Sequence, residues 1–209
     1  KDTDLLYKTI NDRGIAYAKV NRLELAAADM RRCLRLARKG GTKGMKHQAL
    51  MNLGESERRL GNIDKSITSL SEALTVATKC QDRDAIGETL ANMGLALQHK
   101  GKPAEARRSY ERALDIGKKR RNTGLQSSSL AGLASLDKEE GRFASAVKLY
   151  DKAMAASNSI DARHRCEYLA GKIEALASQG VWSKLQEQIQ QLISDCQEGQ
   201  NEDIAQYVL

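Results

Sequence analysis

The chain has 209 residues, of which 41% are apolar and 29% charged, with one Pro, one Trp and one Phe. So few prolines and aromatic residues exclude an all-β sandwich or a disulfide-rich knot. No window approaches ~18 consecutive apolar residues, so no membrane-spanning helix is expected, and the start lacks the pattern of a secretory signal. Because the chain begins at Lys1 without Met and stops at Leu209 inside an apolar pattern, we expect a segment of a longer protein.

The charge is strongly basic and unevenly distributed. The whole chain carries +7, and residues 181–209 hold one Lys and five acids, which leaves +11 on residues 1–180. Such a balance attracts polyanions and acidic proteins. The four cysteines form no C-x-x-C pair, which argues against a zinc or redox motif, and four free thiols favour a reducing compartment such as the cytosol or nucleus. They are Cys33, Cys80, Cys166 and Cys196.

Small residues recur every 40 positions from the first block of the chain to the fourth. Four such columns, each followed by helix formers, indicate an internal repeat. The columns are Gly14, Gly54, Gly94 and Ala134; Asn21, Gly61, Gly101 and Gly141; Ala26, Ser66, Ala106 and Ala146; and Cys33, Ala73, Ala113 and Ala153.

Each block is predicted to form two helices. In the second block, apolar residues between Leu50 and Leu60 have helical spacing, and Gly61 can take the left-handed conformation that ends a helix. The second helix begins two residues later, where Pro103 of the third block occupies a first helical position. Gly54 and Gly94 fall in the middle of helices, where Gly costs ~1 kcal/mol relative to Ala. We therefore expect a neighbouring helix to approach closely at both glycines.

Two segments carry a resemblance to a known family. Met51-Asn52-Leu53-Gly54 with residues 60–67, and Ala91-Asn92-Met93-Gly94 with residues 100–106, resemble tetratricopeptide repeats. The family's usual repeat has about 34 residues and a closing Pro. Here the period is 40 without that Pro, a variant similar to Pins-type G-protein-signalling modulators and kinesin light chains.

The resemblance implies an all-α, right-handed superhelix of antiparallel helix pairs. We expect residues 1–209 to form one such solenoid, with a degenerate fifth unit and the start of a capping helix. The expected repeats are 5–40, 45–80, 85–120, 125–160 and 162–198, and the capping helix begins at 203–209.

In this family the first helix of each repeat lines a concave groove that binds an extended segment or a helix of a partner. By position, the resemblance implies a groove whose floor near Ala91, Leu95, Ala131 and Gly132 is small and mildly apolar. The lining residues would be Gln48, Met51, Asn52, Glu55, Arg58, Arg59, Glu88, Ala91, Asn92, Leu95, Gln98, His99, Ser128, Ala131, Gly132, Ser135, Lys138 and Glu139.

Two asparagines, Asn52 and Asn92, share one position in neighbouring repeats. A side-chain amide both donates and accepts hydrogen bonds, so a row of them can hold a peptide backbone of any sequence. The alternative is that these amides bond to adjacent helices. Arg58 and Arg59 would pair with a ligand carboxylate or form a solvated helix end. Glu88 would repel a carboxylate, which disfavours the chaperone-tail-binding subtype of the family.

Two basic clusters are expected on the outer surface. They are interpreted either as a landing patch for nucleic acid, acidic membrane or an acidic filament, or as a solubilising surface. Because both clusters lack stacking aromatic residues, nucleic acid is disfavoured. The clusters comprise Arg31, Arg32, Arg35, Arg38 and Lys39, and Lys118, Lys119, Arg120 and Arg121.

The sequence offers no catalytic or metal-binding constellation. Residues 40–44 have the wrong order for a phosphate-binding loop, the three histidines lie in different blocks, and no G-x-S-x-G elbow occurs. We therefore predict a non-enzymatic, cofactor-free interaction scaffold that binds a protein segment in its groove. The alternative is a docking module whose basic surface binds a cytoskeletal filament or nucleic acid. The expected location is cytoplasmic, with association to the cytoskeleton as an option.

Overall fold

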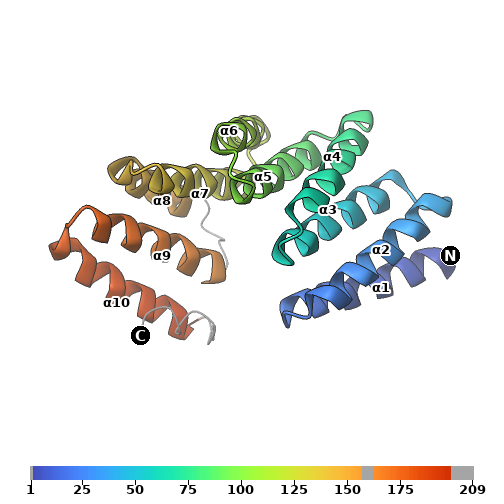
Figure 1. Ribbon diagram of the computed structural model, residues 1–209, viewed down its shortest axis with the longest axis horizontal. Coiled ribbons are helices and arrows are strands. Elements are labelled where there is room, and N and C mark those ends of the chain that lie inside the picture. Colours follow the sequence, from blue (N-terminus) through green and yellow to red (C-terminus); the bar gives the residue numbers. More distant parts are fainter. Residues whose placement is uncertain (1, 157–161, 199–209) are drawn as a thin grey trace. The chain divides into compact units, whose positions relative to one another are not determined.

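The computed structural model describes residues 2–156 and 162–198 of the chain, and these residues form helices and no strand (Figure 1). The all-α fold of repeated helix pairs is confirmed. The expected capping helix at 203–209 and the last residues of the fourth repeat, 157–160, lie outside the described residues. The helices are α1 (Asp2–Lys19), α2 (Leu23–Gly40), α3 (Lys43–Arg59), α4 (Ile63–Lys79), α5 (Arg83–His99), α6 (Pro103–Arg120), α7 (Thr123–Glu139), α8 (Phe143–Ala156), α9 (Ala162–Ser178) and α10 (Trp182–Glu198).

The helices alternate between two roles. The odd-numbered helices, here called leading helices, each pack against the even-numbered helix that follows, here called a second helix. The helix contacts divide the chain into unit 1, residues 1–112, and unit 2, residues 113–209, and the border falls within α6. In unit 1, α3 packs against both α2 and α4, and α5 packs against α4. In unit 2, α8 packs against both α7 and α9, and α9 packs against α10.

The turns inside the pairs have the conformation predicted for them. Asn21 and Gly61 have φ of 57° and 77°, and the equivalent Gly101 and Gly141 have 74° and 76°. The turns between pairs use left-handed residues as well, at Gln81 and Arg121, where the sequence has no glycine to indicate them.

Leading helices begin with side-chain caps at the same repeat position. The side chains of Thr42, Asp82 and Asn122 accept hydrogen bonds from the backbone N–H three residues later, at 2.9–3.1 Å. Such caps satisfy one of the N–H groups that a helix start leaves without a partner. They fix where α3, α5 and α7 begin, and therefore which residues each leading helix exposes.

The mid-helix glycines mark close helix contacts, as expected. A Cβ on Gly54 would stand 2.8 Å from Leu70 Cγ, and one on Gly94 would stand 2.8 Å from the Tyr110 ring. Each partner lies sixteen positions along the chain, in the second helix of the same repeat. Glycine is therefore required at these positions by the packing of the large side chain opposite.

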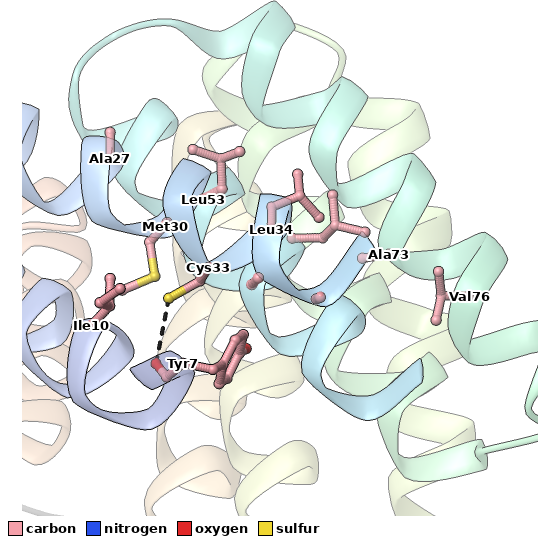
Figure 2. Close-up of a cluster of buried hydrophobic side chains, with 12 residues drawn as sticks. Tyr7, Ile10, Ala27, Met30, Cys33, Leu34, Leu53, Ala73 and Val76 are labelled. Carbon is pink, nitrogen blue, oxygen red and sulfur yellow. Dashed lines mark hydrogen bonds between the residues drawn. The ribbon is translucent and has the colours of Figure 1, made fainter. Parts of the chain in front are cut away.

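The core of unit 1 is built from small residues and a few large ones. Figure 2 shows Tyr7 and Ile10 of α1 facing Met30 and Cys33 of α2. The Cys33 thiol donates to the Tyr7 carbonyl at 3.7 Å, and burial raises the pKa of Cys33 to about 11. In unit 2 a separate core cluster surrounds the buried Tyr150.

Candidate partner-binding face

The leading helices α3, α5 and α7 each carry a row of partly exposed residues at helical spacing, here called the leading-helix stripe. On α3 it contains the exposed Gln48 and Arg59 and the half-buried Asn52. The pattern of exposure repeats one for one on α5, from Glu88 to His99. All the residues predicted to line a groove therefore lie at the surface or just beneath it, apart from Ala131, which is buried. The half-buried members are Met51, Asn52, Glu55, Arg58, Ala91, Asn92, Leu95, Gln98, Gly132, Ser135 and Lys138, and the exposed ones also include Ser128 and Glu139.

The two asparagines of the stripe have different surroundings. Asn52 Nδ2 donates to Asn11 Oδ1 of α1 at 3.0 Å, so one part of this amide bonds to an adjacent helix. In the part of the chain that the structure describes, the Asn92 amide has no hydrogen-bond partner. Asn92 therefore keeps its full capacity to donate and accept, whereas Asn52 is held in place by Asn11.

Arg58 is engaged inside the protein. Its guanidinium forms two hydrogen bonds with the Glu55 carboxylate, at 2.7 and 3.0 Å, and a third contact joins Arg58 Nη1 to His99 Nε2 at 3.2 Å. A ligand carboxylate would have to compete with Glu55 for this cation.

Arg59 connects two leading helices. Its guanidinium donates to the carbonyl of Ala18 at 2.9 Å and to Asn21 Oδ1 at 3.1 Å. Carbonyl groups at the end of a helix have no partner within that helix, so Arg59 of α3 supplies one to the end of α1. The structure therefore adds a third role to the two expected for this residue, that of a link between repeats.

The beginning of α5 is acidic. Although Glu88 is exposed, partial desolvation of its carboxyl raises its pKa, and the nearby carboxylates of Asp84 and Asp82 raise it further. The neighbouring His47 on α3 has a lowered pKa because it is half buried, although Asp82 acts in the opposite direction. Its Nε2 lies 2.9 Å from the Thr89 hydroxyl. This end of the stripe therefore disfavours an acidic ligand group.

The basic cluster on α2 separates into paired and exposed side chains. Arg31 pairs with the buried Glu57 of α3, and Arg38 donates to Glu72 of α4 at 2.8 Å. Burial alone would raise the pKa of Glu72, but hydrogen bonds from Lys46 and Arg38 hold it below its ordinary value. The remaining members Arg32, Arg35 and Lys39 are exposed.

The second basic cluster, at the end of α6, is also partly neutralised. Lys119 forms an ion pair with Asp115 at 2.7 Å, while Lys118 and Arg121 are exposed. Arg120 has an interaction partner as well. Each basic cluster therefore contains some side chains that are paired within the protein.

Buried carboxylates form a group of residues that sequence reasoning missed. The Arg13 guanidinium donates two hydrogen bonds to the Asp29 carboxylate, at 2.7 and 2.8 Å. Asp137, in the repeat position of the apolar Leu97, accepts from Arg142 at 2.6 Å. The available signal was the recurrence of an acid at one repeat position, at Glu57 and again at Asp137. These pairs stabilise the helix pairs and take no part in the stripe.

Metal binding and membrane insertion find no support in the described residues. The described residues contain no group of three or more His, Cys, Asp or Glu side chains arranged to hold a metal ion. None of the helices in the described ranges is long and apolar enough to cross a membrane.

A chain of repeated helix pairs with a recurring, partly exposed stripe defines an α-helical repeat protein. The model of the tetratricopeptide repeat family matches residues 46–119 and 86–159, together more than half of the chain. The chain belongs to the tetratricopeptide repeat family. Proteins of this family are generally non-enzymatic interaction scaffolds. No curated protein sequence matches the chain significantly.

Solved structures share the fold at low sequence identity. BtubC (BKLC) from P. vanneervenii is 14% identical, with a TM-score of 0.75, over 95% of this chain and 83% of that one. The TPR-like repeats of a Podosopora anserina protein assigned as a kinesin light chain give 15% and 0.70, over 97% and 99%. A Rap protein complexed with competence and sporulation factor gives 14% and 0.87, over 97% of this chain and 57% of that one. At these identities the likeness shows the fold alone.

Proposed function

We propose that the chain is a non-enzymatic scaffold that holds an extended segment or a helix of a partner protein against its leading-helix stripe. The observation that carries this proposal is the repetition of the same exposure pattern on α3 and α5, with an amide at the same position of each. A stripe that served only to keep the protein in solution would have no need to place half-buried amides and apolar residues in register.

The chemistry of the stripe favours contact with a main chain. Asn92 has both its donor and its acceptor available, and Leu95 and Met51 add partly exposed apolar surface beside the amides. A peptide backbone presents N–H and C=O groups at regular intervals, which an amide side chain satisfies irrespective of sequence. The acidic start of α5 adds a preference for a basic side chain in the bound segment. The Rap neighbour, solved with a bound factor, is consistent with binding by this fold.

The test uses a displayed library of random 12-residue peptides selected against the wild-type chain. Selected peptides are then titrated against Asn92→Ala and against the matched control Gln190→Ala, an exposed amide on α10. We expect Asn92→Ala to weaken binding about 5- to 100-fold, because losing a hydrogen bond to a buried partner costs about 1–3 kcal/mol, and Gln190→Ala to bind like wild type. Peptides that bind both variants equally would contradict the proposal.

A second candidate function is docking to an acidic filament through α2. The observation that favours it is the exposure of Arg32, Arg35 and Lys39 on one helix. Co-sedimentation with stabilised microtubules tests it, using the triple Glu variant of these residues. The matched control reverses Lys65, Lys79 and Arg83, three other exposed cations of unit 1. Binding that is lost only in the first variant and that weakens steeply with salt supports docking, and equal binding by both variants excludes it.

We place the protein in the cytoplasm under either function. The thiols of Cys33, Cys80 and Cys166 are free, which is typical of proteins in a reducing compartment. Association with the cytoskeleton belongs to the second function, and the microtubule experiment decides it.

A further inference from the structure

The turn between α6 and α7 carries a motif that neither function proposed above uses. Thr123, the first residue of α7, follows two arginines, with Arg120 three positions and Arg121 two positions before it. Many protein kinases recognise arginines on the N-terminal side of the hydroxyl that they modify, because guanidinium groups pair with carboxylates beside the kinase active site. Thr123 is the only Ser or Thr of the sequence with arginine at both of these positions.

The structure distinguishes Thr123 from Ser145, the other hydroxyl residue with an arginine three positions before it. The Ser145 hydroxyl donates to the Asp137 carboxylate, and Arg142 donates to the same carboxylate at 2.6 Å. Asp137 is only 4% exposed, so a kinase would have to break a buried network to reach Ser145. Thr123 is exposed, and its hydroxyl has no hydrogen-bond partner among the residues that the structure describes. Thr123 is therefore the accessible hydroxyl of the two.

The backbone around Thr123 also opens easily. Asn122 lies outside both helices in an extended conformation, with φ of −82° and ψ of 97°. Arg121 has φ of 56°, a left-handed conformation that strains a residue with a Cβ. Gly124, the second residue of α7, weakens the first turn because glycine has a low helix propensity. These residues can therefore unwind locally, so that a kinase can bind the segment in an extended form.

We propose that Thr123 is the acceptor site of an arginine-directed protein kinase, and that the phosphate stabilises the start of α7. In the transfer, a bond forms between Thr123 Oγ1 and the γ-phosphorus of ATP. The bond from that phosphorus to the oxygen that bridges to the β-phosphate breaks, and ADP leaves with its electron pair. The hydroxyl proton passes to the base of the kinase.

A phosphate on Thr123 meets a favourable electrostatic environment. It carries about −1.5 to −2 charges at pH 7. The first turn of α7 contains no acid, and the N-terminus of a helix favours negative charge. The four preceding residues, 118–121, are all cations, and Lys118 and Arg121 among them are exposed. The phosphate should therefore stabilise the first turn of α7 and offset close to half of the formal charge of the second basic cluster.

The test is phosphorylation of the folded chain by the catalytic subunit of cAMP-dependent protein kinase with Mg-ATP, with the site located by mass spectrometry. We expect one phosphate per chain, on Thr123. Thr123→Ala should take up none, whereas Thr123→Ser should still be modified.

The recognition by arginine is tested with Arg121→Gly. Glycine accepts the left-handed conformation, so circular dichroism should show an unchanged fold. The substitution should lower kcat/KM for phosphorylation about 10- to 100-fold through the loss of a charge-assisted pair. The matched control Lys118→Ala removes an exposed cation of the same cluster, five positions before Thr123, and should be phosphorylated like wild type.

Amide hydrogen exchange measures the effect of the phosphate on the fold. Phosphorylation should slow the exchange of the N–H groups of residues 125–127 about 2- to 5-fold at low ionic strength, and salt should reduce the effect. Phosphate found only on other hydroxyls, or taken up only by a heat-unfolded chain, overturns the site. An Arg121→Gly chain that is phosphorylated like wild type overturns the recognition by arginine, and unchanged exchange overturns the stabilisation of α7.

Discussion

Two serines of α7 have the same burial but opposite hydrogen-bonding status. Ser127 and Ser129 are 1% and 0% exposed. The Ser127 hydroxyl donates to the Ala153 carbonyl of α8 at 2.7 Å, whereas the Ser129 hydroxyl has no partner among the described residues. Replacing each by alanine therefore isolates the effect of that hydrogen bond in one helix of one chain.

The two substitutions should change stability in opposite directions. Each substitution raises the free energy of unfolding by about 0.5 kcal/mol through helix propensity, because Ala favours a helix more than Ser does. Ser129→Ala also removes a buried hydroxyl without a partner, worth about 1 kcal/mol or more, so it should stabilise by about 1.5–2 kcal/mol. Ser127→Ala loses a net contribution of about 1 kcal/mol and leaves a small gap, so it should destabilise by about 0.5–1 kcal/mol.

Urea denaturation followed by circular dichroism measures both effects through the transition midpoint, provided that the slope of the transition is unchanged. Amide hydrogen exchange in α7 adds a local measurement that does not require the whole chain to unfold in one step. We expect a difference of about 2–3 kcal/mol between the variants, equivalent to about 4–12 °C in Tm for a chain of this size. Ser66→Ala in α4, which removes another partnerless buried hydroxyl, should behave like Ser129→Ala. A Ser129→Ala protein that is no more stable than wild type would refute the reasoning.

Three further predictions concern a titrating residue, a close contact and a strained turn. Since burial lowers the pKa of His47 in the folded chain while the unfolded chain keeps about 6.5, protonation favours unfolding. The contribution of neutral His47 to stability is therefore fully present above about pH 6.5 and is lost as the pH falls toward the lower folded pKa. Urea midpoints measured at pH 7.5 and 5.5 should show a smaller decline for His47→Gln than for the wild-type chain. Gly94→Leu should destabilise the fold by about 1–3 kcal/mol or more, because even a Cβ at this position would stand 2.8 Å from Tyr110. The control Gly40→Ala should not lower the Tm, since no atom lies within 4 Å of its new Cβ. Gln81→Gly should stabilise the fold by about 0.5–1 kcal/mol. Glycine removes the steric strain of the left-handed conformation at Gln81, and this gain exceeds the extra conformational entropy that glycine gives the unfolded chain. A lower Tm for Gln81→Gly would show that the Gln81 side chain makes a compensating contact.

The repeated helix pairs were predictable because their determinants are local. A glycine such as Gly61 indicates both the end of one helix and a positive φ, and the mid-helix Gly94 indicates a close neighbour. Both predictions are confirmed by the backbone angles and by the distances to Tyr110. The left-handed Gln81 was not predictable, because its side chain carries no sign of the conformation that the turn imposes.

The surroundings of the leading-helix stripe were harder to predict, because its contacts cross from one repeat to the next. Arg59 reaches Ala18 across 41 positions, and Asn52 reaches Asn11 across the same separation. Spacing within one repeat shows which side chains face outward, but the partner of each depends on the offset between neighbouring helices. The binding role of the stripe stays a prediction that the peptide titration addresses.

The contact between glycine and a large residue limits how this array can be shortened, lengthened or recombined. Gly94 and Tyr110 belong to one repeat, so a 40-residue cassette cut from 83 to 122 would carry both halves of their fit. The hydroxyl of Tyr150 instead occupies the space that a Cβ on Gly171 would need, and Gly171 belongs to the following repeat. A chimera joined after residue 156 must therefore supply a glycine at the position of Gly171. Otherwise the first helix of the transplanted repeat cannot pack against Tyr150.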